Sequence, residues 1–194
     1  MKRKQNKYAR CPCCFIEKHR TEISVCLPIL EHILKKQLLY YKDLSIDAYD
    51  VLINDNLQWA CDDCLNSKKA ILAFPALQHN EWNSHLAYYD TDCICRNCDT
   101  DFKFTKEEKK LWYETLRFRI ESKPVSCLVC RKKIRQLKIE NNTLSELFKK
   151  EITALSPEEL GTVIRIYTQW GKTEKTKYYE RLLKKKLRQT HPPH

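Results

Sequence analysis

Four Cys-x2-Cys pairs divide the sequence and constrain its fold more than any other feature. The pairs are Cys11/Cys14, Cys61/Cys64, Cys95/Cys98 and Cys127/Cys130. One such pair spans an edge of a tetrahedral zinc site, so two pairs complete a site with four sulfur ligands. Pairing neighbours in sequence closes the shorter loops and loses less chain entropy, although crossed pairings also satisfy the spacing. We therefore expect two zinc ions, each held by four cysteines.

The total of eleven cysteines in 194 residues indicates either disulfides outside the cell or metal inside it. The basic, polar stretch from Met1 to Cys14 lacks the apolar centre of a signal peptide, and an odd count cannot be paired completely within one chain. There is also no run of 18 apolar residues, so we expect no membrane span. Most of the cysteines are therefore interpreted as thiolate ligands in a reducing cytoplasm.

The net charge of +11 is concentrated at the two ends of the chain. Residues 1–20 and residues 172–194 each carry a net charge of +6, and the segment between them is nearly neutral. Basic arms of this kind favour contact with the phosphates of nucleic acid through release of counterions. The alternatives are that the arms only keep the protein dissolved, or that the chain binds a protein partner. The oligomeric state is not indicated by the sequence.

The third and fourth pairs lie in a segment with further recognisable residues. A Phe-x-Phe-Thr motif follows the third pair, an acidic and aromatic helical stretch comes next, and Pro-x-x-Cys-x2-Cys-Arg ends the segment. These positions are Cys95, Cys98, Phe102, Phe104, Thr105, Glu108, Tyr113, Pro124, Cys127, Cys130 and Arg131. The segment resembles the probable zinc-ribbon domain of treble-clef type found in small bacterial proteins. This resemblance implies a zinc-binding treble clef but no reaction.

A site of four cysteines has no open position for water, so we expect it to be structural. Asp99 stands where the resembled family usually has Gly, and Asp tolerates the left-handed backbone that this position tends to need. A Cys-x2-Cys pair that wraps one edge of a zinc site is called a knuckle. The remaining thiols, Cys13, Cys26 and Cys93, lie outside the four pairs assigned to knuckles. They are interpreted as buried or incidental cysteines, with redox or zinc sensing as the weaker alternative.

The segment around the second pair, residues 56–68, carries Asn-Leu-Gln before the cysteines and Lys68 after them. It resembles the C-terminal end of zinc-stapled HNH endonucleases, with Glu31-His32-Ile33 standing where that family has Asp-His-Ile. The resemblance implies His32 as a general base that activates water, Asn56 as the residue that orients it, and a divalent metal at the phosphate.

Three departures favour an inactive relative of that nuclease family. Leu65 replaces an Asn or His that helps to bind the catalytic metal, and Glu31 replaces the Asp. His32 also lies in a helical pattern, whereas the family places this residue in a β-hairpin. His79 and His85, near Asn80 and Asn83, are weaker metal-ligand candidates. We therefore expect a non-catalytic protein, with an HNH-type endonuclease as the alternative.

Several helices are expected from apolar spacing and capping motifs. The first two are expected at residues 28–41 and from Ser45 to about Asn54. Three more are expected to begin after Thr105, Thr143 and Ser156, the last of these ending at Gly171. A final helix is expected over about 174–189. The predicted fold is a helix-rich α+β protein with two zinc-ribbon or treble-clef modules and a C-terminal helical bundle. The predicted boundaries are a first module at 1–75, a linker at 76–92, a zinc-ribbon domain at 93–140 and a helical region with a basic tail at 141–194.

Overall fold

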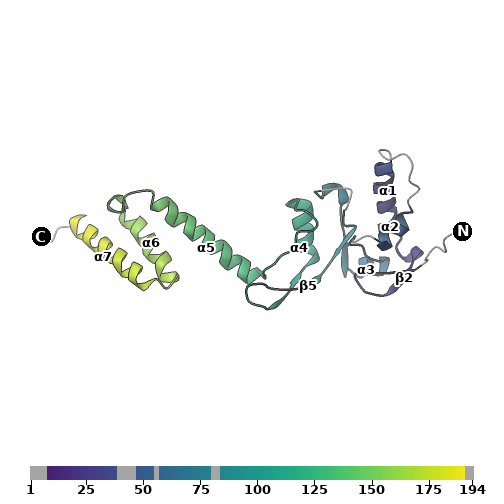
Figure 1. Cartoon of the computed structure of the whole chain (residues 1–194), viewed down its shortest axis with the longest axis horizontal. Coiled ribbons are helices and arrows are strands. Elements are labelled where there is room, and N and C mark those ends of the chain that lie inside the picture. Colours follow the sequence, from purple (N-terminus) through teal and green to yellow (C-terminus); the bar gives the residue numbers. More distant parts are fainter. Residues whose placement is uncertain (1–7, 39–46, 55–56, 80–83, 191–194) are drawn as a thin grey trace. The chain divides into compact units, whose positions relative to one another are not determined.

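The computed structural model describes residues 8–38, 47–54, 57–79 and 84–190. Figure 1 draws these residues as a ribbon and labels the helices α1 to α7 and the strands β2 and β5. The chain divides into two compact units, Met1–Cys127 and Leu128–His194. In the described part of the chain, no helix combines the length and the apolar character that a bilayer span requires.

The first zinc module begins with the antiparallel hairpin of β1 (Tyr8–Arg10) and β2 (Glu17–His19), in which Ala9 faces Lys18. A 3₁₀ turn, η1 (Arg20–Glu22), follows and is capped by the His19 side chain. Three helices complete the module: α1 (Cys26–Leu38), α2 (Ala48–Asn54) and the short α3 (Asp62–Asn66).

The core of this module forms where the apolar face of α1 meets α2 and the segment that leads to Cys61. Leu30 from α1 and Leu52 from α2 are buried there beside Trp59. Cys11, Cys61 and Cys64 belong to the same cluster, and the partly buried Cys14 packs against it, so the four cysteines of the first pair of motifs adjoin an apolar interior.

The second half of Met1–Cys127 is built on two further hairpins. Strand β3 (Ala70–Leu72) pairs with β4 (Ala87–Tyr89), and β5 (Thr91–Ile94) pairs with β6 (Asp101–Phe104), both antiparallel. A 3₁₀ turn, η2 (Pro75–Leu77), lies between β3 and β4. After β6, α4 (Lys106–Lys110) continues into a π-helical turn, η4 (Leu111–Thr115).

An aromatic core joins these hairpins to the helix. Tyr88, Phe104 and Tyr113 are almost fully buried, with ring centroids of Tyr88 and Tyr113 5.8 Å apart. Two buried polar residues add contacts across the unit: the Glu114 carboxylate accepts the Phe74 backbone N–H at 2.8 Å, and the Lys109 ammonium donates to the Tyr89 carbonyl at 2.6 Å. These contacts join the first zinc module to the hairpins that follow it within Met1–Cys127.

The unit Leu128–His194 consists of α5 (Leu128–Leu147), a 3₁₀ turn η5 (Ile152–Ala154), α6 (Pro157–Gln169) and α7 (Thr173–Thr190). Its buried core joins Leu144 of α5, four residues of α6 and Tyr179 of α7. Rings of Tyr167 and Tyr179 stack with centroids 5.6 Å apart. The Trp170 indole N–H donates to Glu140 at 2.7 Å and ties the end of α6 to α5.

The expected α+β fold with two zinc modules and C-terminal helices is confirmed. One helix prediction is wrong, because no helix begins at Thr143. Instead α5 runs without a break from Leu128 through Thr143, whose hydroxyl donates to the Ile139 carbonyl one turn earlier. A Thr in the middle of a helix satisfies its hydroxyl in this way and does not act as a cap.

The other predicted helices agree with the structure where it describes them. Ser156 and Glu159 form the expected capping box, and Thr105 accepts the Glu108 N–H. Residues 39–46, including Ser45, lie outside the described residues. The predicted domain boundaries remain predictions, and the segment expected as a linker contains η2 and β4.

Candidate metal centres

The sulfurs of Cys95, Cys98, Cys127 and Cys130 lie within 4.8 Å of one another. The first two cysteines sit in the turn between β5 and β6. The Cys95 N–H donates to the Thr100 carbonyl at 3.0 Å, and the Asp99 N–H donates to the Cys95 carbonyl at 2.8 Å. Asp99 has a φ of 53°, so it adopts the left-handed backbone that we expected at this position.

The other two cysteines are placed by the start of α5. Leu128 is the first residue of this helix, so Cys127 directly precedes it and Cys130 lies in its first turn. The Cys127 N–H donates to Cys95 Sγ at 3.2 Å, and this contact lowers the pKa of Cys95 to about 6. Unpaired N–H groups at a helix start favour anionic sulfur in the same way.

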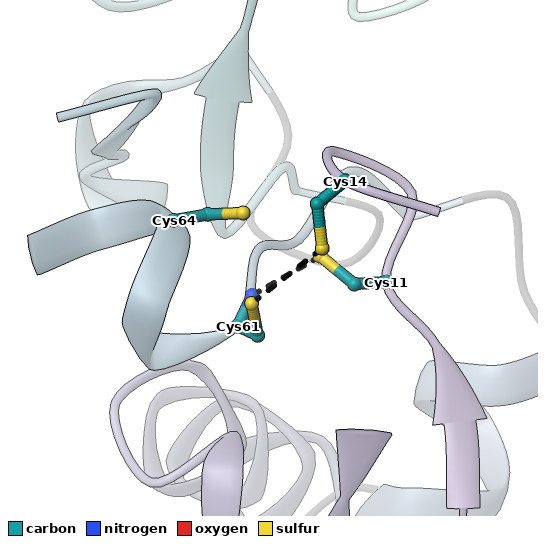
Figure 2. Close-up of side chains that lie close together, drawn as sticks. All are labelled: Cys11, Cys14, Cys61 and Cys64. Carbon is teal, nitrogen blue, oxygen red and sulfur yellow. Dashed lines mark hydrogen bonds between the residues drawn. The ribbon is translucent and has the colours of Figure 1, made fainter. Parts of the chain in front are cut away.

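The first centre repeats this arrangement with Cys11, Cys14, Cys61 and Cys64, again within 4.8 Å of one another. Figure 2 shows the four side chains pointing toward one another, with the Cys61 N–H donating to Cys11 Sγ at 3.3 Å. Cys61 directly precedes α3, as Cys127 directly precedes α5. Both centres therefore pair a hairpin knuckle with a helix N-terminus.

The knuckle of the first centre also has the same backbone hydrogen bonds as the second. The Cys11 N–H donates to the Ile16 carbonyl at 3.0 Å, and the Phe15 N–H donates to the Cys11 carbonyl at 2.8 Å. Phe15 has a φ of 60°. A bulky residue rarely adopts this conformation, so the knuckle geometry is imposed on a side chain that does not favour it.

Both centres have the dimensions of a zinc site. Zinc–sulfur bonds of about 2.3 Å in a tetrahedron place neighbouring sulfurs roughly 3.8 Å apart. The distance from Cys14 Sγ to Cys61 Sγ is 3.9 Å, and that from Cys98 Sγ to Cys127 Sγ is 3.8 Å. Among the described residues these are the two clusters of metal-ligand type, and each supplies four sulfurs. A complete set of thiolates suits zinc and leaves no position for a reacting water.

The two centres differ in burial. In the first, Cys11, Cys61 and Cys64 are buried, and burial raises the pKa of Cys61 to about 11. In the second, Cys98 is exposed and only Cys95 is buried. A bound cation deprotonates its thiol ligands. The buried thiols of the first centre therefore need the metal more than the thiols of the second centre do in order to lose their protons.

Polar contacts around the first centre hold α3 in place, and the sequence did not single them out. Asp62 accepts the Ser24 and Val25 N–H groups at 3.0 and 3.2 Å, which fixes the start of α3 against the entry to α1. Asp63 accepts from the Lys18 ammonium at 2.6 Å, which ties α3 to β2. The two acids between Cys61 and Cys64 were the available signal, since acidic residues favour the first turn of a helix.

The residues proposed for nuclease chemistry are not brought together by the described part of the structure. His32 lies in the middle of α1 with an exposed side chain, and Asn56 lies outside the described residues. His32 borders a groove of about 390 Å³ with Ile29, Ile33 and Pro75, which is apolar in character.

The remaining cysteine and histidine candidates belong to neither four-cysteine centre. Cys26 is buried, with its thiol 3.4 Å from the Ala60 carbonyl, and burial raises its pKa to about 11. Cys13 and Cys93 are half-buried and belong to neither cluster. His79 is exposed and His85 is buried, and neither belongs to a cluster of metal-ligand type in the described residues.

Comparison with known proteins agrees with the second centre. Residues 89–138 match the model of a family described as a probable treble clef domain. No curated protein and no solved structure matches the chain. The matched segment contains all four cysteines of the second centre, and the first centre repeats its geometry. The chain is a zinc-binding protein with two four-cysteine centres.

Proposed function

We propose that this zinc-binding protein is a non-catalytic module that binds nucleic acid through the helices α5 and α7. The observation that carries the proposal is the distribution of charge. Residues 128–194 contain sixteen Lys and Arg residues against seven Asp and Glu residues, so this segment holds most of the net charge of the chain. A basic helical unit of this kind is suited to the phosphate backbone.

Four basic side chains of α5 are exposed. They are Lys132, Lys133, Arg135 and Lys138. None of the four forms an ion pair with an acid in the described part of the chain. Cations that are already paired release fewer counterions on binding, so unpaired ones contribute more to phosphate affinity.

Helix α7 adds a second set of cations. Lys184, Lys185 and Arg188 are exposed near its end, and Tyr178 is exposed at its middle. The zinc centres have a structural part in this proposal, because all their ligand positions are filled by cysteine. The second centre includes Cys130 in the first turn of α5, so zinc would fix the start of this helix without supplying any chemistry.

The test measures binding of the zinc-loaded full chain to duplex DNA, duplex RNA and single strands over a range of salt concentrations. Affinity should fall steeply with salt, by roughly 0.9 in logarithmic slope for each duplex phosphate contact. Replacing Lys132, Lys133, Arg135 and Lys138 by Ala should reduce the slope for duplex by roughly three to four units. A matched control replaces four exposed lysines of the other unit, Lys35, Lys36, Lys69 and Lys103. Absence of binding at low salt, or equal losses in both variants, would refute the proposal.

A protein partner is the second candidate, favoured by apolar side chains on the same helix. Val129, Ile134, Leu137 and Ile139 are 46–61% exposed. Exposed apolar groups in such number on one helix often mark an interaction surface. If a second copy of this chain covers them, light scattering will show a dimer that Ile134→Asp and Leu137→Asp dissociate. If the protein stays monomeric at all concentrations, a second copy of this chain does not cover this surface.

The nuclease alternative has no observation in its favour among the described residues. Incubation of the purified protein with plasmid and magnesium or manganese tests it directly. The nuclease reading requires nicking that is lost in His32→Ala, whereas the non-catalytic proposal expects no nicking by either protein.

A further inference from the structure

A cavity of about 830 Å³ opens within Met1–Cys127, and none of the eight zinc-ligand cysteines is among its described lining residues. Its lining comes from β1 and the first knuckle, from α2, from the segment before Cys61, from the region of β4 and from residues 120–123. Sites that bind small molecules usually have volumes of about 300–1,000 Å³. The cavity is therefore large enough for a ligand of the size of a nucleotide.

Rings form part of the wall. Trp59, His85 and Tyr89 all line the cavity, and Trp59 and His85 are 4% and 5% exposed. The Gln58 N–H donates to His85 Nδ1 at 3.4 Å, so the neutral ring carries its proton on Nε2. The backbone of Ile120 is a weak partner of the His85 ring, and no hydrogen bond of good geometry from the described residues reaches this Nε2. A buried polar atom without a good partner is a group that a polar ligand would satisfy.

Positive charge surrounds the same cavity. Arg10 and Lys123 line it with exposed side chains, and Glu121 is the one carboxylate among the lining residues that the structure describes. Behind the wall, the buried Lys109 ammonium donates to Tyr89 and Gln58, both through neutral oxygens. Lys109 forms no ion pair with an acid among the described residues. A buried cation without a carboxylate partner is costly, and a nearby anion would compensate it.

We propose that this cavity binds a nucleotide, with the base against the ring of Tyr89 and the phosphate near Arg10 and Lys123. Stacking on aromatic rings is tolerant of base identity, and guanidinium and ammonium groups are the usual partners of phosphate. The cavity lies within Met1–Cys127, so this proposal does not depend on nucleic-acid binding by α5 and α7. The ligand is either a free mononucleotide or one nucleotide unit of a strand, and both present the same chemistry.

Isothermal titration calorimetry of the zinc-loaded full chain at low salt tests the site. The ligands are AMP, GMP, CMP and UMP, with inorganic phosphate and short single-stranded oligonucleotides as separate arms. At least one nucleotide should bind saturably and at least tenfold more tightly than phosphate. Arg10→Ala with Lys123→Ala should weaken that binding at least tenfold. The matched control, Lys35→Ala with Lys103→Ala, removes the same charge from exposed positions that do not line the cavity and should change it less than twofold.

Arg10 also donates to the Phe15 carbonyl at 3.0 Å in the first knuckle, so its replacement can disturb the zinc centre. Lys123→Ala alone removes a rim cation outside the knuckle and should weaken nucleotide binding at least threefold with both zinc ions retained. Binding of mononucleotides alone identifies a free ligand, and binding of strands that is lost in the rim variants identifies a unit of a strand. No binding in any arm, binding by phosphate as tight as by nucleotide, or unchanged binding in the rim variants would overturn the proposal. A failure here leaves salt-dependent binding by α5 intact, so the two proposals are separable.

Discussion

The backbone N–H of Cys61 donates a hydrogen bond of 3.3 Å to the sulfur of Cys11, 50 residues earlier in the chain. Cys127 makes the equivalent 3.2 Å contact with Cys95. In each case the donor directly precedes a helix and the acceptor begins a knuckle. N–H contacts to thiolate sulfur moderate its charge and orient it. The two centres thus share one local arrangement of a knuckle and a helix start.

The first prediction concerns the left-handed residue of each knuckle. Phe15 and Asp99 have φ values of 60° and 53°. A side chain in this region costs about 1–2 kcal/mol, and a β-branched one is disfavoured further. Phe15→Gly and Asp99→Gly should therefore leave stability unchanged or raise it, whereas Phe15→Val and Asp99→Val should lower it by about 1 kcal/mol or more. Thermal unfolding of the zinc-loaded proteins measures this, and Val tolerated as well as Gly would contradict the assigned geometry.

The second prediction concerns the order of metal loss. The centre with Cys98 is the more exposed, and the centre with Cys11 is embedded in an apolar core. A chelator should therefore remove zinc in two phases, with the fast phase from the exposed centre. Cys98→Ser should abolish the fast phase and Cys61→Ser the slow one, followed with a coloured zinc indicator. A single phase in the unaltered protein, or the reverse assignment, would contradict the difference in burial.

The third prediction concerns Glu140 in the helical unit. Hydrogen bonds from Gln136 and then from the Trp170 indole lower the pKa of this carboxylate. A lowered folded-state pKa means that the contact stabilises the helices above the ordinary Glu pKa of about 4.3 and is lost as pH falls through the folded value. The indole N–H signal of Trp170, assigned with Trp170→Phe, should titrate in NMR spectra with a midpoint below about 4.3 and should not titrate in Glu140→Gln. A midpoint at or above that value would count against the contact.

Local signals in the sequence were sufficient for the ligands and for most helix starts. Ser156 with Pro157 and Glu159 predicts the start of α6, and Gly171 ends it with a φ of 66°. These features depend on a few neighbouring residues, which is why the pattern contains them. Thr143 shows the limit of such patterns. Its capping motif is overridden because α5 has already begun beside Cys127 and continues through it.

Contacts between distant segments were not predictable in this way. Tyr88 lies in the segment 76–92 that the sequence predicts to be a linker, but β4 pairs with β3 and places Tyr88 in a core with Tyr113. The buried Lys109 was not recognised as a link to Gln58, because 51 residues separate them. The cavity likewise requires β1, α2 and residues 120–123 to meet, and no periodicity in the sequence indicates that meeting.

The zinc content per chain tests the central claim most directly. Mass spectrometry under native conditions, on protein purified with zinc and without chelator, should find two zinc ions in the unaltered chain. Cys61→Ser and Cys127→Ser should each retain one. One zinc ion or none in the unaltered protein, or loss of both ions from either single variant, would contradict two independent four-cysteine centres.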